Sequence, residues 1–129
     1  MLRCALPLLA AVTTFAAASA AAQGLPRNFP ATALRGEIVV GQPPEITLNG
    51  QASRLAPGSR IRGTNNLLVM SGAVVGQRLV VHYTLDQLGQ PQDIWVLTPE
   101  ELAREPWPAT LQEAQTWRFD PAAQAWSKP

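Results

Sequence analysis

Turn-forming residues interrupt the chain between Glu37 and Leu97 so often that no helix of useful length fits there. Gly, Pro and Asn separate apolar runs of only a few residues. Short apolar runs bounded by such residues are typical of β-strands, and several of them at close spacing indicate a small antiparallel barrel or sandwich. The spacing of the turn residues therefore predicts a mainly β fold.

The dipeptide Asn49-Gly50 is the clearest turn signal in this region. A two-residue hairpin loop of the primed type needs a positive φ at both positions, which Asn and Gly tolerate best. With these residues as the loop, Glu45 lies opposite Arg54, and the two charges attract each other across the strands. The other face of the hairpin then carries the apolar side chains of Ile46, Leu48 and Leu55.

The longest predicted strand runs from Arg78 to Leu85, and the chain returns over residues 92–97 after a turn. Alternation places two sets of side chains on opposite faces of this strand. One set is Leu79, Val81, Tyr83 and Leu85, and the other is Val80, His82 and Thr84.

After Leu97 the sequence pattern changes from one typical of strands to one typical of short helices. Residues 98–101, Thr-Pro-Glu-Glu, form a capping box with proline at the first helical position, and they predict a short helix that ends near Arg104. Residues 110–113 repeat the capping pattern and open a second short helix, and residues 117–126 indicate a strand or hairpin. We therefore expect one or two short helices at the C-terminal side of the β-rich domain.

The N-terminus has the pattern of a cleavable signal peptide over residues 1–22. Arg3 gives a positive start, an uncharged apolar run follows from Ala5 to Ala18, and small residues surround the expected cut. The run is too short to span a membrane, which needs about 20 apolar residues. We expect a periplasmic or secreted protein with no membrane span after cleavage, a lead-in segment over residues 23–35, and a single domain over residues 36–129.

Cleavage changes the chemistry of the chain. It removes Cys4, the only cysteine, so no disulfide or thiolate ligand is expected. It also removes Arg3, which leaves nine basic and nine acidic residues and gives no bulk attraction to nucleic acid. Residues 23–78 are net basic and residues 79–129 net acidic, and attraction between these halves within one fold is favoured over an interaction surface.

Candidates for catalysis are few. His82 is the only histidine, and its place on an alternating strand favours a packed or surface-facing ring over a catalytic one. Glu100 and Glu101 have a structural role in the first turn of a helix, and Asp86 and Asp93 flank a turn. We expect a protein that is not an enzyme, with no catalytic residue, metal site or cofactor; a hydrolase using His82 or carboxylates is the weaker alternative.

Two groups of residues are candidates for binding. Arg54, Arg60 and Arg62 occur near Asn65 and Asn66 and could follow a phosphate backbone, but this stretch lacks the aromatic residues that stacking on bases requires. A solvated arginine face is therefore favoured over a nucleic-acid site.

All four tryptophans, Trp95, Trp107, Trp117 and Trp126, occur in the last third of the chain. Trp107 lies between two prolines, a setting that suits display to a sugar, peptide or protein. We regard Trp107, Trp117 and Trp126 as candidate binding residues, although rings that cap one open end of a barrel are the favoured alternative.

Two stretches resemble known families. The runs Gly36–Val40, Ile46–Gly50 and Val75–Val81 resemble the small OB-like barrels of exported bacterial proteins of unknown function, over residues 36–97. Residues 81–86, Gly89 and residues 93–97, followed by Trp117-Arg118-Phe119, resemble the TonB carboxy-terminal domain over residues 78–121. The second resemblance implies two strands, a helix and a tryptophan–arginine–phenylalanine strand.

Together these patterns predict a non-catalytic binding or assembly accessory of the cell envelope, with an envelope protein or a glycan as its partner. A TonB-like periplasmic interaction module is the alternative.

Overall fold

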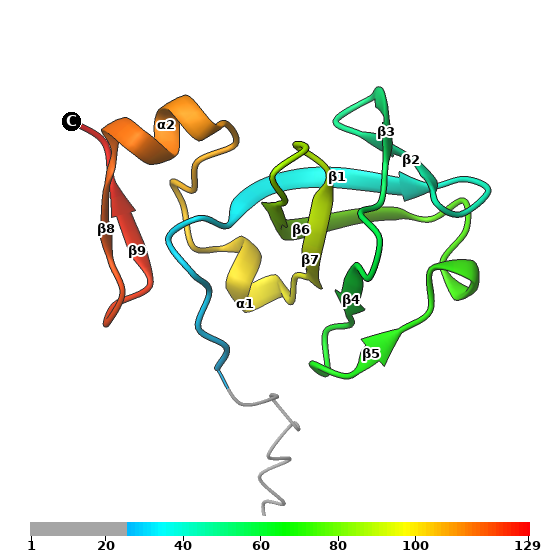
Figure 1. The fold of residues 1–129 in the computed structure, drawn as a ribbon. Helices are drawn as coiled ribbons and strands as arrows, with labels where there is room; N and C mark the ends of the chain where they lie inside the picture. The colour runs from blue at the N-terminus through cyan, green and yellow to red at the C-terminus, as the bar shows by residue number, and fades with distance from the viewer. Residues whose placement is uncertain (1–25) are drawn as a thin grey trace, which may run out of the picture.

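A computed structural model describes residues 26–129. The predicted signal peptide and the first residues of the lead-in segment lie outside this range. The fold is mainly β, with a seven-stranded sheet, a two-stranded sheet and two short helices near the C-terminus (Figure 1). The predicted fold class and the predicted short C-terminal helices are confirmed.

The large sheet has the strand order β3-β2-β1-β6-β7-β4-β5. Its strands are β1 (Leu34–Val40), β2 (Glu45–Leu48), β3 (Gln51–Arg54), β4 (Arg60–Arg62), β5 (Leu68–Val69), β6 (Arg78–Leu85) and β7 (Pro91–Val96), with a 3-10 turn at Ser71–Ala73. The sheet is not a closed barrel, and β4 lies parallel to β7. The expected antiparallel arrangement is therefore wrong at this pair, because β6 runs in the same direction as β5 and the chain does not reverse at the connection between them.

The hairpin at Asn49-Gly50 forms as predicted. Glu45 is opposite Arg54 and Leu48 is opposite Gln51, and both loop residues have positive φ, 53° at Asn49 and 80° at Gly50. The Arg54 guanidinium lies 2.9 Å from the Glu45 carboxylate on the exposed face. The two-residue turn and the cross-strand charge pair therefore favour the same register of β2 against β3.

The inner face of the large sheet buries the first apolar core. Both the expected hairpin face and the expected β6 face contribute to it. Its fully buried members are Leu34, Ile38, Val40, Ile46, Leu55, Ile61, Val81, Tyr83 and Ile94, and Leu48, Leu79 and Leu85 pack against them.

A second core lies on the opposite side of the sheet. It consists of Phe29, Ala33, Leu97, Trp107 and Trp126. Residues 26–33 run between the β8–β9 hairpin and α1 (Figure 1) and so contribute to this core. The lead-in segment is thus a packed part of the domain, whose described structure begins before residue 36.

The C-terminal elements are α1 (Pro99–Leu102), α2 (Leu111–Thr116), β8 (Arg118–Asp120) and β9 (Ala125–Ser127). The predicted capping box is present at α1, where the Thr98 hydroxyl accepts from the Glu101 N–H and the Glu101 carboxylate accepts from the Thr98 N–H. The predicted cap at Thr110 also forms.

One buried ion pair joins the two oppositely charged halves of the chain. Arg27 and Glu101 pair through two hydrogen bonds, and both side chains are shielded from solvent. The other two ion pairs of residues 26–129 join Glu45 to Arg54 and Glu37 to Arg78, and both lie within the basic half.

Candidate functional site

Large apolar side chains are exposed in one short segment beside β5. Leu67, Leu68, Met70 and Val75 are each more than half exposed, and Met70 reaches 82%. Exposed apolar side chains that occur singly need no explanation, whereas a contiguous group marks a contact surface. This segment is therefore the first candidate for a binding site.

The backbone of β5 explains why the segment is exposed. Val69 pairs with Ile61 of β4, and the Leu67 carbonyl accepts from the Gly63 N–H at 2.9 Å. Backbone groups alternate in direction along a strand, so the N–H and C=O of Leu68 point away from the sheet. No strand of the described chain pairs with that side of β5, which leaves an open edge.

The side chains alternate in the same way. Val69 faces inward and packs against the first core, so Leu68 and Met70 lie on the outer face. Leu68 is opposite Arg62, and Arg60 lies on the same outer face because Ile61, between the two arginines, is buried. We call Arg60, Arg62, Leu68 and Met70 the edge patch.

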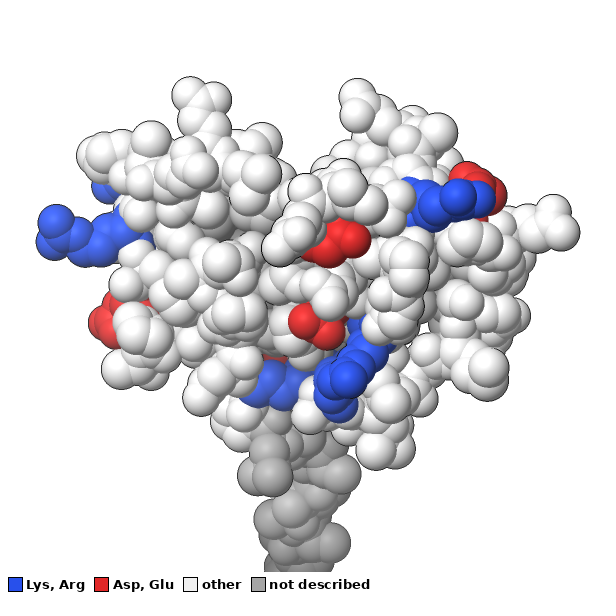
Figure 2. Space-filling model, in the orientation of Figure 1, with Lys and Arg blue, Asp and Glu red and all other residues white. Residues whose placement is uncertain are grey.

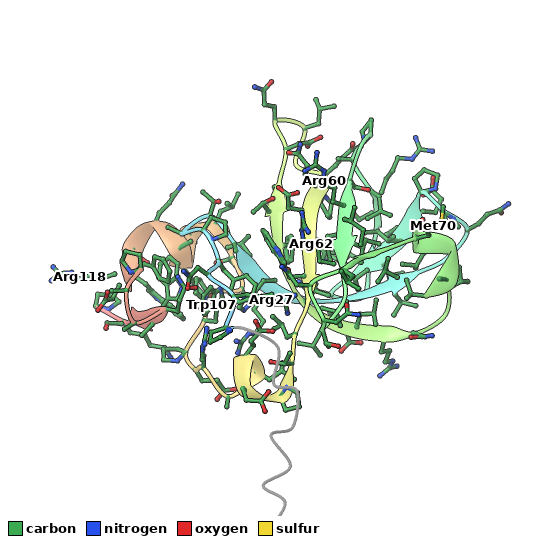
Figure 3. All side chains as sticks on the ribbon, turned by 90° about the horizontal axis from the view of Figure 1, so that it is seen from below. Arg27, Arg60, Arg62, Met70, Trp107 and Arg118 are labelled. Carbon is green, nitrogen blue, oxygen red and sulfur yellow. The ribbon has the colours of Figure 1, made fainter. Side chains whose placement is uncertain are left out.

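The edge patch is basic as well as apolar. None of the ion pairs of residues 26–129 includes Arg60 or Arg62. A hollow of about 340 Å³ is lined by Arg60, Met70 and both residues of β5. On the face drawn in Figure 2, basic side chains at the lower centre lie beside acidic ones, and others lie at the left and right. Figure 3 shows Arg27, Arg62 and Arg60 in succession.

Not all the candidate arginines come together. Arg60 and Arg62 share β4, and the Arg62 guanidinium lies 3.4 Å from the carbonyl oxygen of Asn66. Arg54 instead lies on β3, at the far end of the strand order, where Glu45 neutralises its charge. The expected cluster of three arginines is therefore reduced to two.

The candidate tryptophans lie mainly in the interior. Trp107 and Trp126 are 6% and 5% exposed, so neither ring is displayed at the surface, as a binding role would require. The reason is that residues 26–33 and the β8–β9 hairpin enclose them in the second core. Trp117 is half-buried, and the Lys128 ammonium lies 5.4 Å from its ring centre. The three rings therefore pack mostly over the outer face of the sheet.

His82 is fully buried in contact with the second core. Its ring stacks on Trp107 with 4.0 Å between centroids, and its Nε2 accepts from the Arg35 Nε–H at 3.3 Å. Its Nδ1 has no partner in the described structure. Burial, followed by the positive charges of Arg35, Arg27 and Arg104, lowers the pKa of His82 from 6.5 to about 3. The imidazole is thus a neutral packing group.

This low pKa makes stability depend on pH. At pH 5 the unfolded chain binds a proton at His82 and the folded chain does not, so acid favours unfolding. Above pH 6.5, His82 is neutral in both the folded and the unfolded chain and does not lower the free energy of unfolding. As the pH falls from 6.5 towards 3, protonation of the unfolded chain lowers this free energy progressively. Urea denaturation should therefore give a free energy of unfolding about 2 kcal/mol lower at pH 5 than at pH 7.

His82→Gln should remove this difference, since glutamine does not titrate. The single histidine also gives an independent measurement, because its proton NMR signal should not shift between pH 5 and pH 8. A titration midpoint near 6.5 in the folded protein would contradict the prediction.

The described residues show neither a metal cluster nor a membrane-crossing helix. No three His, Cys, Asp or Glu side chains among residues 26–129 gather closely enough to hold a metal ion. In the same range, no helix has both the length and the apolar character needed to cross a bilayer.

Two arrangements are not evident from the sequence. Arg118 and Phe119 of the tryptophan–arginine–phenylalanine segment lie in β8 (Arg118–Asp120), which pairs with β9 in its own sheet rather than with β6 and β7, while Trp117 caps α2. The edge patch was also missed, although four successive apolar residues at 67–70 give a signal for it. An edge strand that packs on only one of its faces can bury only every second residue of such an apolar run.

Comparisons with known proteins give no relative from which a role could be transferred: no protein-family model, no curated protein and no solved structure matches this chain.

Proposed function

We propose that this chain is a non-catalytic binding or assembly accessory of the cell envelope, which takes an extended segment of a partner protein along the open edge of β5. The observation that carries the proposal is the coincidence of unpaired backbone groups at Leu68 with the exposed side chains of Leu68 and Met70. The signal-peptide pattern of residues 1–22 supports the export of the chain.

The backbone edge favours a peptide over a lipid surface. Addition of a strand to an open edge supplies hydrogen bonds to the outward N–H and C=O groups, while alternate side chains of the added strand contact the surface. A bilayer core offers no such partners, and each unsatisfied backbone group placed there costs several kcal/mol. The edge patch is therefore suited to an extended polypeptide.

The charge of the patch indicates the composition of that polypeptide. Neither Arg60 nor Arg62 makes an ion pair within residues 26–129, although Asp93 of β7 is opposite Arg60 in the sheet. A segment with apolar residues at alternate positions and acidic residues between them would cover Leu68 and Met70 and also neutralise the two arginines. Opposite charge would in addition speed the encounter at low salt.

Two substitutions at Met70 can separate the backbone contribution to peptide binding from the side-chain contribution. Its φ of −74° suits proline, and its N–H makes no backbone hydrogen bond within the described fold. Met70→Pro should therefore leave the fold intact while removing one outward donor and obstructing the edge. Met70→Ala removes only the side chain.

The test uses synthetic eight-residue peptides with leucine at alternate positions and either glutamate or lysine between them, measured by fluorescence anisotropy. We expect the glutamate set to bind and the lysine set not to bind. Met70→Pro should weaken binding about tenfold, which corresponds to about 1.4 kcal/mol, and Met70→Ala should weaken it less. Leu88→Ser is the matched control, because Leu88 is equally exposed but lies on the β6–β7 turn.

Equal binding by Met70→Pro and the unaltered chain would overturn the proposal. Tighter binding to anionic lipid vesicles than to either peptide set, unaffected by Met70→Pro, would also overturn it and assign the patch to a membrane surface.

A further inference from the structure

A second hollow lies beside Arg62, on the side away from β5. It has a volume of about 510 Å³ and opens between the N-terminal segment and the loop that joins β4 to β5. We call it the polar groove. Its lining includes Asn28, Arg62, Thr64, Asn65, Asn66 and Trp95.

The walls of the polar groove are held in place by Arg27. Its guanidinium donates to the Gly63 carbonyl at 2.9 Å and to the Val96 carbonyl at 2.7 Å, and it also pairs with buried Glu101. The N-terminal segment, the β4–β5 loop and the end of β7 are thereby joined through one buried side chain. A ligand would meet a formed site and would not have to order these segments.

The polar groups of the groove are largely free. The side-chain Oδ1 of Asn65 accepts from the Leu67 N–H, but its side-chain amide N–H groups make no hydrogen bond within residues 26–129. The side chains of Asn28, Thr64 and Asn66 make no hydrogen bond within residues 26–129, and Arg62 makes a single long one. The groove therefore presents several side-chain donors at once.

The charge of the groove is positive. No carboxylate lines it, and Glu101 already balances Arg27, so the guanidinium of Arg62 is the uncompensated charge. This favours a ligand with an anionic group, for which arginine supplies paired donors.

The groove also has an aromatic wall. Trp95 is half-buried, and Phe29 supports it from the second core with 5.5 Å between ring centroids. Binding sites combine such apolar walls with a few fixed polar groups. A small inorganic anion would use Arg62 and leave the indole ring without a role.

We propose that the polar groove binds an acidic saccharide, whose anionic group pairs with Arg62 and whose ring lies against Trp95. The hydroxyl groups of the sugar accept from the amides of Asn65 and Asn66. The site adjoins the edge patch and shares Arg62 with it, but it does not depend on strand addition at β5.

The experiment titrates the mature chain with a galacturonic acid tetrasaccharide by calorimetry, alongside its neutral methyl ester and inorganic phosphate. We expect the acid to bind about tenfold or more tightly than the ester and more tightly than phosphate. Arg62→Gln should remove this preference. Asn66→Gly should weaken binding to both sugars, because Asn66 has a φ of 64° that glycine tolerates and only the amide is lost.

Arg60→Gln is the matched control, since Arg60 shares the strand but does not line the groove. It should bind the acid within about twofold of the unaltered chain, and so should Met70→Pro, which separates this site from strand addition. Unfolding midpoints of all variants should agree. Unchanged binding by Arg62→Gln, binding of phosphate as tight as that of the acid, or no binding of the acid would each overturn the proposal.

Discussion

Replacing Trp107 with alanine is expected to lower the free energy of unfolding by about 3–5 kcal/mol, out of a total of about 5–15 kcal/mol for a domain of this size. Its ring stacks on His82 and lies 6.0 Å from both Phe29 and Trp126, between centroids. Its indole N–H donates to the Ala33 carbonyl at 3.0 Å. Alanine would leave a large cavity and an unpaired carbonyl, and urea denaturation would measure the loss.

Trp107→Phe is the graded control and should lose less, because it keeps an aromatic ring in the second core. Leu88→Ala, at an exposed turn position, should change the free energy of unfolding by less than about 0.5 kcal/mol. A loss below about 1 kcal/mol for Trp107→Ala would show that the second core adds little to stability.

Glu101→Gln is expected to cost about 3–5 kcal/mol of stability, because it leaves the Arg27 guanidinium buried without its counter-charge. Burial alone would raise the pKa of Glu101, but hydrogen bonds from Arg27 and Thr98 outweigh it and hold that pKa below its usual value. The stabilisation is therefore present above pH 4.5 and is lost as the pH falls through the lowered pKa. Chemical denaturation at pH 7 gives the cost of the substitution directly.

The double variant Arg27→Met with Glu101→Gln tests the interpretation. Removing both charges eliminates the unpaired ion, so the double variant should be more stable than Glu101→Gln alone. If the double variant instead loses as much free energy of unfolding as the two single variants, Arg27→Met and Glu101→Gln, lose together, the two side chains stabilise the fold independently of each other.

The parts of the fold that could be predicted depend on local chemistry. Asn49 and Gly50 specify their own turn and therefore the register of β2 and β3. Alternation along β6 correctly separates the inner side chains, such as Val81 and Tyr83, from His82 on the other face. In each case the prediction depends only on residues that are close together in the sequence.

The remaining features depend on distant partners. The parallel pairing of β4 with β7 and the contact between Arg27 and Glu101, 74 positions apart, have no local signature. For the same reason Trp107 could be placed at a turn but not assigned to a core. Charge made Arg60 and Arg62 candidates from the sequence, whereas the exposure of Leu68 and Met70 follows from the position of β5 at the end of the sheet.

The second core unites residues that are synthesised at very different times. Phe29 and Trp126 lie in the same core, and the Phe29 N–H donates to the Gln124 side-chain oxygen at 2.7 Å. Translation proceeds from the N-terminus, so Phe29 can contact His82 and Trp95 early but lacks its contacts with Gln124 and the β8–β9 segment until that segment has been made. The second core can therefore complete its packing only after the β8–β9 segment has been synthesised, and until then its apolar residues lack part of their cover.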